Sequence, residues 1–257
     1  MRIFGLIGFP LSHSFSEKYF TEKFRRENIP DAVYRLFPLE NANDFPSFLQ
    51  ANPGIAGLNI TIPYKEKIIP FLDELDETAK AVGAVNVIQI REDGGKKILE
   101  GYNSDVYGFR QSLKPFLTSA HERALILGTG GASKAVEYVL KQIGVQCIFA
   151  SREKKNIPGK NILTYAEVNE YVLSACRLIV NATPCGMFPD VKSAPPLPYE
   201  FITPEHFLYD LIYNPAETEF MKRGKEKGAT VMNGMDMLKL QAERAWTIWN
   251  PGLNPGF

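Results

Sequence analysis

The sequence predicts an α/β protein of two domains, and three observations support that prediction. Short apolar segments typical of buried strands alternate with amphipathic helical segments along the 257 residues. A glycine-rich turn at residues 128–133 joins an apolar strand to a helix, a pattern typical of a Rossmann-type dinucleotide-binding domain. The helix expected at 237–249 follows that region and has no partner of its own there. We therefore expect this last helix to dock on the N-terminal domain.

Composition excludes several classes of function. Lys and Arg together number 29, as do Asp and Glu, so the formal net charge is zero. The chain therefore has no excess of positive charge that would favour nucleic acid or an anionic membrane as a partner. Hydrophobic residues make up 45% of the chain and charged residues 23%, as in packed proteins and unlike disordered ones. The apolar segment at 1–9 contains two glycines and is too short for a membrane helix. We expect a small-molecule ligand.

Cysteine spacing offers neither a metal site nor a disulfide framework. Cys147, Cys176 and Cys185 are scattered, and they show no CxxC or paired Cys/His spacing. We therefore expect reduced thiols, a cytoplasmic location and no metal.

The N-terminal region predicts strands that alternate with helices. A strand at 2–7 precedes the loop GFPLSHS and a helix in which aromatic residues recur at near-helical spacing, namely Phe15, Tyr19, Phe20 and Phe24. A strand at 32–37, a helix at 45–50 and an Ile-rich strand closed by Pro63 follow. Pro63 is expected to start the next helix, and another helix is expected at 74–82. The segments AVNVIQIR and ILEGYN, joined by EDGGKK, predict a hairpin.

From Ala124 onward the pattern predicts a βαβ unit. An apolar strand, the glycine-rich turn and an amphipathic helix are followed by a second apolar strand that ends at Ser151. The remaining expected elements are strands at 178–181, 207–211 and 229–232 and the helix at 237–249.

The turn GTGGAS predicts a site for the pyrophosphate of a dinucleotide. Gly128 permits the tight turn, Gly130 lets the backbone approach the pyrophosphate, and the helix that follows presents free N–H groups to it. The third position of the fingerprint is Ser133, which is still small. The alternative is a tight strand-to-helix turn without a ligand.

Charged residues after the second Rossmann strand bear on cofactor choice. An NAD-binding fold places an acidic residue there, whereas this chain has Arg152 with Lys154 and Lys155, which favours the 2′-phosphate of NADP. Glu153 would repel a phosphate if it pointed inward, so the preference for NADP over NAD stays open at this point. All four charges could instead be solvated surface groups.

Polar residues at the end of the Ile-rich strand predict a second site. In NITIPYK, Asn59 and Thr61 leave an apolar strand at alternate positions, and Lys65 follows at the carboxyl edge of a sheet. In GYNSDVYG, Asn103 and Asp105 precede an expected helix, and the alternative for Asp105 is a plain helix N-cap.

Three further polar residues each have a structural alternative. Asn86 interrupts a β-branched strand and needs hydrogen-bond partners if buried. Ser14 forms a capping box with Glu17 in sequence, so its hydroxyl could serve only the helix. Gln241 lies on an apolar helical face, where either a ligand or the core could supply a partner for its amide.

Eight segments together resemble the shikimate dehydrogenase family. In chain order, the segments are GFPLSHSFS, GLNITIPYK, GAVNV, GYNSD, GTGGASKA, NATPCGM, DLIYNPAET and NGMDMLKLQA. They extend from Gly8 to Gln241, and several are specific to this family rather than to dinucleotide-binding folds in general.

The resemblance implies an NADP-dependent oxidoreductase that reversibly reduces 3-dehydroshikimate to shikimate in the chorismate pathway of aromatic amino acid biosynthesis. It implies a catalytic domain at 1–102 plus 236–257, a Rossmann-type NADP-binding domain at 103–235, and a substrate cleft between them. Lys65 and Asp105 become the catalytic pair. The implied substrate contacts are Ser14, Ser16, Thr61, Asn86, Asp105, Tyr213 and Gln241. The implied cofactor contacts are Glu77, Gly128, Thr129, Gly130, Gly131, Ala132, Ser151, Arg152, Leu211 and Gly234.

The chain departs from the family pattern at three places. Glu17, Tyr19 and Phe20 stand where the family commonly has Pro and then His-Asn, which predicts a shifted start of the first helix. Glu153 replaces the Thr of the usual Asn-Arg-Thr. Asp236 replaces a glycine before the methionine of the last helix.

Three functions compete at this stage. The first is an NADP-dependent shikimate dehydrogenase, and the second is a quinate or quinate/shikimate dehydrogenase that uses NAD. The third is a nucleotide-binding sensor without catalysis, against which the presence of both Lys65 and Asp105 argues. We expect a monomer or homodimer whose partner is a small-molecule substrate.

Overall fold

The structure, a computed structural model, describes residues 1–11 and 14–252 and contains two compact units. Unit 1 comprises Met1–Ser104 with Ala242–Phe257, and unit 2 comprises Asp105–Gln241. The divisions fall within two helices, α4 (Ser104–Leu113) and α8 (Met235–Trp249). The domain boundaries expected from the sequence, after residues 102 and 235, lie shortly before these divisions.

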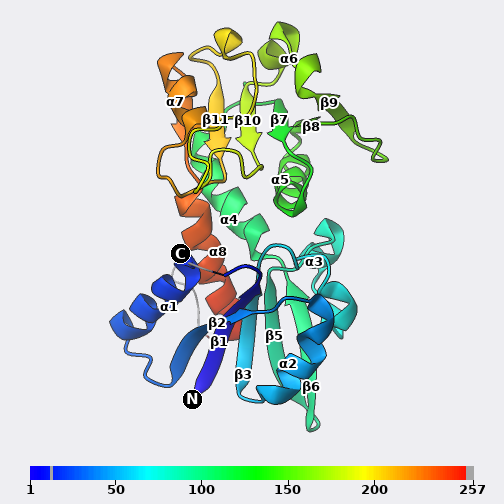
Figure 1. Ribbon diagram of the computed structural model, residues 1–257, viewed down its shortest axis with the longest axis vertical. Coiled ribbons are helices and arrows are strands. Elements are labelled where there is room, and N and C mark those ends of the chain that lie inside the picture. The colour runs from blue at the N-terminus through cyan, green and yellow to red at the C-terminus, as the bar shows by residue number, and fades with distance from the viewer. Residues whose placement is uncertain (12–13, 253–257) are drawn as a thin grey trace. The chain divides into compact units, whose positions relative to one another are not determined.

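Unit 1 is built on a mixed six-stranded sheet of order β2-β1-β3-β5-β6-β4 (Figure 1). Its strands are β1 (Arg2–Gly8), β2 (Ala32–Pro38), β3 (Ile55–Ile60), β4 (Glu74–Leu75), β5 (Val87–Asp93) and β6 (Lys96–Tyr102). β1 lies between β2 and β3 and is parallel to both, so Ile7 lies beside Ile60 where β1 and β3 end. The residues that follow β1 and β3 therefore meet at one edge of the sheet.

The expected hairpin is present as β5 and β6, which pair antiparallel from Val87 with Tyr102 to Asp93 with Lys96. Gly94 and Gly95 form its turn, with φ of 57° and 81°. A two-residue turn in which both central residues have positive φ matches the right-handed twist of the strands, and glycine adopts it without a steric cost.

The helices of unit 1 are α1 (Phe15–Arg26), α2 (Phe45–Ala51) and α3 (Glu77–Val82). They differ from the sequence-based expectation at two places. The helix expected from Pro63 was wrong, because Pro70 has no N–H to continue the helical hydrogen bonds, and only a turn and the 3₁₀ helix η2 (Ile69–Phe71) form. The helix expected at 74–82 begins later, because the Asp76 side chain caps the backbone N–H groups of Thr78 and Ala79.

An aromatic cluster joins the C-terminal half of α8 to the sheet of unit 1. Phe4 on β1 stacks on Trp249 with ring centroids 4.8 Å apart, and Phe20 on α1 stacks on Tyr34 of β2 at 4.7 Å. The indole N–H of Trp249 donates to the carbonyl of Ile88 at 3.0 Å. The last helix thus docks on the N-terminal part of the chain, as expected.

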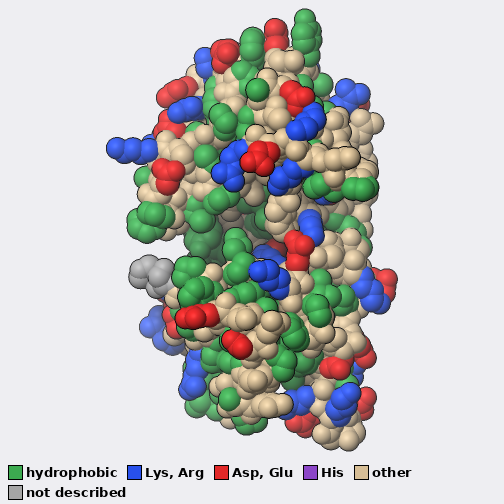
Figure 2. Space-filling view, turned by 45° about the vertical axis from the view of Figure 1, so that its right-hand side comes forward, with side chains coloured by type: hydrophobic (Ala, Val, Ile, Leu, Met, Phe, Trp, Pro, Cys, Tyr) green, Lys and Arg blue, Asp and Glu red, His purple; other side chains and the backbone are tan. Residues whose placement is uncertain are grey.

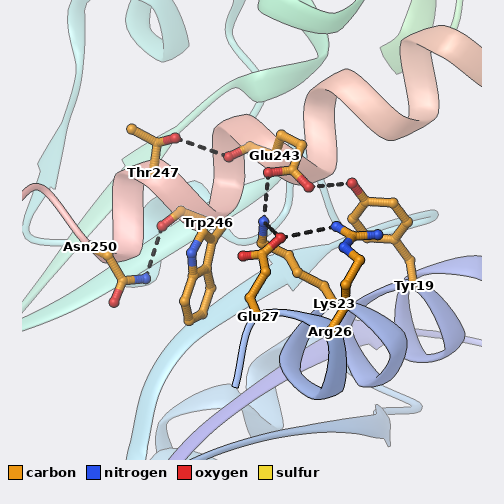
Figure 3. Close-up of polar contacts among 8 residues, drawn as sticks. All are labelled: Tyr19, Lys23, Arg26, Glu27, Glu243, Trp246, Thr247 and Asn250. Carbon is orange, nitrogen blue, oxygen red and sulfur yellow. Dashed lines mark hydrogen bonds and ion pairs between the residues drawn. The ribbon is translucent and has the colours of Figure 1, made fainter. Parts of the chain in front are cut away.

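Polar contacts reinforce the packing of α1 on α8 (Figure 3). Lys23, which is only 4% exposed, donates to Glu243 at 2.8 Å and to Glu27 at 2.9 Å. The hydroxyl of Tyr19 donates to the same Glu243 carboxylate, and both burial and Glu243 raise the pKa of Tyr19. Two of the residues that depart from the family pattern, Tyr19 and Phe20, therefore build this interface.

Unit 2 contains a fully parallel sheet of order β12-β11-β10-β7-β8-β9 (Figure 1). Its strands are β7 (Arg123–Leu127), β8 (Gln146–Ser151), β9 (Asn161–Thr164), β10 (Leu178–Asn181), β11 (Phe207–Asp210) and β12 (Thr230–Met232). Its helices besides those shared with unit 1 are α5 (Gly131–Gln142), α6 (Glu170–Ala175) and α7 (Glu219–Glu226). This order is that of the Rossmann fold, and its direction reverses between β7 and β10, where such sheets bind ligands.

Sequence analysis missed β9, α6 and α7, which are all short. Asn169 and Thr218 cap the two helices through side-chain oxygens, so capping residues mark the starts that apolar periodicity was too brief to reveal. The remaining 3₁₀ helices are η1 (Ala42–Asp44), η3 (Lys114–Phe116), η4 (Tyr165–Glu167) and η5 (Tyr199–Phe201).

The surface has mixed charge. Lys and Arg side chains are interspersed with Asp and Glu side chains on the face shown in Figure 2. Within residues 1–11 and 14–252, no helix combines the length and the apolar character needed to cross a bilayer.

Packing at Gly57 gives a test of the aromatic cluster. A Cβ at Gly57 on β3 would lie 2.4 Å from the Trp249 ring, whereas a Cβ at Gly54 would meet its nearest atom at 3.5 Å. Gly57→Ala should therefore lower the free energy of unfolding by about 1–3 kcal/mol through overpacking. The matched variant Gly54→Ala should change it by less than about 0.5 kcal/mol. Urea denaturation of both variants measures this difference, and equal effects would contradict the packing of α8 on β3.

Candidate active site

A pocket of about 580 Å³ lies in unit 2 at the carboxyl ends of β7, β8 and β10. Its position coincides with the reversal of strand order described above. The lining includes five of the expected cofactor residues, namely Gly128, Thr129, Gly130, Ser151 and Arg152. The other lining residues are Glu153, Lys155, Tyr165, Ala182, Thr183, Pro184, Cys185, Asp190, Ser193, Pro195 and Pro196.

The glycine-rich turn forms the base of this pocket. Gly128 has a φ of +97°, and a Cβ there would lie 2.8 Å from the Thr183 methyl, so the position requires glycine on both counts. Gly130 is the N-cap of α5, and its carbonyl accepts a 2.6 Å hydrogen bond from the Ser133 hydroxyl. Gly131 and Ala132 form the first turn of α5, where backbone N–H groups and the helix dipole favour an anion.

The charges after β8 divide into two groups. Arg152, Glu153 and Lys155 line the pocket, and Lys155 donates a 2.9 Å hydrogen bond to the hydroxyl of Thr129 in the glycine-rich turn. Lys154 instead pairs with Glu167 at 2.8 Å. From the segment after β8, two cations and one carboxylate therefore line the pocket, and Asp190 adds a second carboxylate to the lining.

Strands β10 and β11 end in a buried polar cluster beside the pocket. Asn181 and Asp210 are both fully buried, and the Asn181 amide donates to the Asp210 carboxylate at 3.0 Å. The same carboxylate accepts from the Ile212 backbone at 3.0 Å and from the Thr218 hydroxyl at 2.6 Å. Burial raises the pKa of Asp210 from its ordinary 3.8 to about 6, and the three hydrogen bonds oppose that rise.

Two more expected cofactor residues lie against each other in unit 2. A Cβ at Gly234 would meet the Leu211 carbonyl oxygen at 2.1 Å, and the Gly234 N–H donates to the Ile212 carbonyl at 2.9 Å. Only glycine therefore fits at position 234. Tyr213 follows two residues after Leu211, and burial raises its pKa.

In unit 1 a chain of hydrogen bonds leads to the expected substrate contact Asn86. The hydroxyl of Tyr34 donates to Asn59 at 2.8 Å, and burial raises the pKa of Tyr34. Asn59 in turn donates to the Asn86 carbonyl at 3.3 Å. The Asn86 side chain accepts from the Ser104 backbone N–H at 2.7 Å. Asn86 thus belongs to a network that begins at Tyr34, and Asp105 directly follows its last member.

The first helix is capped by an expected substrate residue. Ser14 is the N-cap of α1, and its hydroxyl oxygen accepts from the Ser16 backbone N–H at 3.1 Å. The helix-capping alternative is therefore realised, although the contact joins Ser14 to Ser16 rather than to Glu17. Ser12 and His13 of the same motif lie outside the described residues.

The segment after β3 carries Thr61 and Lys65. The Thr61 N–H donates to the Ile7 carbonyl at 2.9 Å, and a Cβ at Gly8 would lie 2.4 Å from the Thr61 methyl. The carbonyl of Lys65 accepts from Val85 at 2.7 Å, which places Lys65 next to the residue that precedes Asn86. Lys65 lies in a turn and not in the first turn of a helix, because the expected helix is absent.

Two helices of unit 2 bring together the remaining residues. Asp105, which is 8% exposed, is the second residue of α4. It therefore places a carboxyl group in the first turn of the helix and is not the N-cap. A Cβ at Gly108 on α4 would lie 2.5 Å from the Met237 carbonyl and 3.1 Å from Gln241 on α8. Gln241 is 8% exposed, and its amide donates to the Leu238 carbonyl at 3.0 Å.

Comparison with known proteins now bears on this arrangement. Residues 6–88 match the family model described as the shikimate dehydrogenase substrate-binding domain. The chain is 38% identical over 270 residues to a curated shikimate dehydrogenase (NADP⁺) from Carboxydothermus hydrogenoformans, with 99% of this chain and 93% of that protein covered. The chain belongs to the shikimate dehydrogenase family.

Solved structures agree with this assignment. A Thermus thermophilus shikimate 5-dehydrogenase in complex with NADP(H) and shikimate has a TM-score of 0.83 and 30% identity, over 99% of this chain and 95% of that one. A Corynebacterium glutamicum quinate dehydrogenase in complex with NAD has a TM-score of 0.84 and 29% identity, over 98% and 94%. The fold alone therefore does not separate the two substrates or the two cofactors.

One residue that the family resemblance implied for the cofactor lies apart from the others in the chain. Glu77 opens α3 in unit 1, where it is exposed and pairs with Lys80 at 3.1 Å. The other implied cofactor residues belong to unit 2.

Sequence reasoning overlooked several residues that shape the pocket. Tyr165, Thr183 and Cys185 line it, and Asn181 and Asp210 lie buried behind it. A signal was present for the last two, because each is a polar residue that ends an apolar strand of a parallel sheet. The segment containing Tyr165 gave no signal, since β9 and η4 were not expected.

The buried carboxylate makes a prediction about stability and pH. Because folding raises the pKa of Asp210 to about 6, protonation of this group stabilises the folded protein at low pH. That contribution is lost as the pH rises through about 6. Asp210→Asn does not titrate, so the wild type should gain about 1 kcal/mol of unfolding free energy relative to this variant between pH 7 and pH 5. Urea denaturation at both pH values measures the difference, and a difference that does not vary with pH would contradict the assignment.

Proposed function

We propose that this protein catalyses the reversible, NADP-dependent reduction of 3-dehydroshikimate to shikimate. The observation that carries the proposal is the pocket at the reversal of strand order. A glycine-rich turn and two cations line this pocket, and the chain belongs to the shikimate dehydrogenase family. The reaction belongs to the chorismate pathway of aromatic amino acid biosynthesis. We propose that it takes place in the cytoplasm and that the enzyme is a monomer or a homodimer.

The residues around the pocket fit a dinucleotide phosphate. The N–H groups of residues 128–132 would bind the pyrophosphate at the start of α5, and Ser151 would contact the ribose. Arg152 and Lys155 would hold the 2′-phosphate that distinguishes NADP from NAD. Leu211, Gly234 and Glu77 are proposed for the nicotinamide end. NADPH, when bound, supplies the hydride for the reduction.

Lys65 and Asp105 are the proposed catalytic pair. Addition of hydride to a ketone leaves negative charge on the oxygen, so the site needs a proton donor and a positive charge at that atom. The Lys65 ammonium can supply both. Asp105 would hold the ammonium in position and exchange a proton with the substrate hydroxyl.

Substrate orientation is assigned to neutral hydrogen-bonding groups. Ser14 and Ser16 at the start of α1 would bind the substrate carboxylate through their hydroxyls. The remaining proposed contacts are Thr61, Asn86, Tyr213 and Gln241. Asn86 is already oriented by the hydrogen-bond network of unit 1, which lowers the entropic cost of aligning the substrate.

A second candidate function rests on Glu153. This carboxylate also lines the pocket, and an acidic residue after the second Rossmann strand favours the free ribose hydroxyls of NAD. The alternative is therefore an NAD-dependent quinate or quinate/shikimate dehydrogenase. A sensor that binds nucleotide without catalysis is the third possibility.

Initial rates separate these functions. Absorbance at 340 nm would be followed with shikimate and with quinate, each in the presence of NADP⁺ and of NAD⁺. The proposal predicts the highest kcat/KM for shikimate with NADP⁺. A higher value for quinate with NAD⁺ would favour the alternative, and no turnover with any pair would favour the sensor.

Lys65→Ala tests the proposed proton donor. Turnover should fall by about a hundredfold or more, the usual contribution of a positioned acid or base, while NADPH binding is retained. Lys67→Ala is the matched control, because Lys67 is exposed in the same turn. Both variants would be assayed at saturating shikimate and NADP⁺. Near-normal turnover of Lys65→Ala would remove Lys65 from the catalytic role.

Arg152→Ala tests cofactor choice. The variant should raise the KM for NADP⁺ at least about tenfold more than the KM for NAD⁺, because only NADP carries the phosphate that a guanidinium can bind. Lys154→Ala is the control, since Lys154 pairs with Glu167 and does not line the pocket. Glu153→Thr should shift preference further toward NADP⁺. Equal losses for both cofactors in Arg152→Ala would show that Arg152 has a structural role.

A further inference from the structure

A buried carboxylate in unit 2 has no part in the proposed chemistry. Asp210 ends β11 with no solvent exposure, and the proposed proton transfer does not use it. Its oxygens accept hydrogen bonds from three different segments of the chain. The donors are Asn181 at the end of β10, the backbone of Ile212, and Thr218 at the start of α7.

Asn181 also forms hydrogen bonds with the loop that follows β10. The side-chain oxygen of Asn181 accepts from both the backbone N–H of Thr183 at 3.1 Å and the Thr183 hydroxyl at 2.6 Å. The Thr183 hydroxyl accepts in turn from the Cys185 N–H at 3.2 Å. Each donor is matched by an acceptor, so the loop at 182–185 has its conformation fixed from inside the fold.

The anchored loop forms a wall of the pocket and touches the glycine-rich turn. Thr183 and Cys185 both line the pocket. The Thr183 methyl also lies where a Cβ at Gly128 would be only 2.8 Å away, so this side chain packs directly on the turn. A continuous series of contacts therefore leads from Asp210 through Asn181 and Thr183 to the backbone proposed to bind the pyrophosphate.

We propose that Asp210 is a positioning residue for the nucleotide, which it serves by holding the 182–185 loop against the glycine-rich turn. The inference rests on the proposed binding of NADP in this pocket. The function lies in the hydrogen-bonding geometry of Asp210, because all three groups that donate to its carboxylate are neutral. An amide of the same shape can accept from Asn181 and Ile212 and donate to the Thr218 hydroxyl.

Thr218 provides a matched control within the same cluster. Its hydroxyl donates to the Asp210 carboxylate but accepts from the Met221 N–H, and so it connects the carboxylate to α7 and not to the pocket. Thr218→Val should therefore lower the melting temperature and leave nucleotide affinity nearly unchanged.

The test measures the Kd of NADPH by its fluorescence for the wild type and for three variants of the full chain. Asp210→Ala should weaken binding about tenfold or more, whereas Asp210→Asn should stay within about threefold of the wild type. Thr218→Val should also stay within about threefold. Wild-type affinity in Asp210→Ala would overturn the inference, and so would an equal loss in Asp210→Ala and Thr218→Val, which would indicate general destabilisation.

Thr183→Val covers the case in which Asp210→Ala does not fold. This variant keeps the methyl that packs on Gly128 and loses only the hydroxyl that joins Asn181 to Cys185. NADPH should bind it at least about threefold more weakly, and unchanged affinity would overturn the inference. If the wild type does not bind NADPH, both the proposed function and the inference are contradicted. If the wild type binds NADPH and the variants bind it with the same Kd, only the inference is contradicted.

Discussion

Parallel pairing of the strands that end at Leu127, Ser151, Asn181 and Asp210 is the constraint on which the candidate nucleotide site depends. Parallel strands bring the segments that follow them to one edge of the sheet, and the reversal of strand order between β7 and β10 separates two of those segments enough to leave a pocket. In unit 1 the same rule applies to β1 and β3, so Gly8 and Thr61 meet where the strands end. The direction of the strands alone therefore explains why polar residues proposed to contact ligands lie at these edges.

Buried polar networks then fix the segments at those edges. In unit 1 the series runs from Tyr34 through Asn59 to Asn86, and in unit 2 it runs from Thr218 through Asp210 to Asn181. Burying such groups costs several kcal/mol unless their hydrogen bonds are made, roughly 2–7 kcal/mol for an unpaired polar group. Each network therefore allows few alternative loop conformations, and a ligand that binds there meets groups that are already oriented.

Much of this arrangement was predictable from local sequence. The hairpin followed from Gly94 and Gly95, and the pyrophosphate turn followed from Gly128 and Gly130, because glycine spacing between strand and helix patterns has a direct backbone meaning. The helix predicted after Pro63 was wrong, since Pro70 lacks the N–H that would continue an α-helix, and α3 starts late because Asp76 caps it. The contact of Lys155 with Thr129, and that of Asp210 with Asn181, join segments distant in sequence, which single-sequence patterns do not reveal. The proposed roles of Lys65, Asp105 and the other site residues remain predictions.

Amide hydrogen exchange with mass spectrometry tests most directly whether the two ligands bind at these two strand edges. The account predicts that NADP⁺ alone slows exchange at residues 128–133, 151–155 and 182–186, the segments after β7, β8 and β10. Shikimate alone should slow exchange at 14–16, 61–65 and 103–105. Protection of the unit 1 segments by NADP⁺ with none at the glycine-rich turn, or no protection by either ligand at saturating concentration, would contradict it.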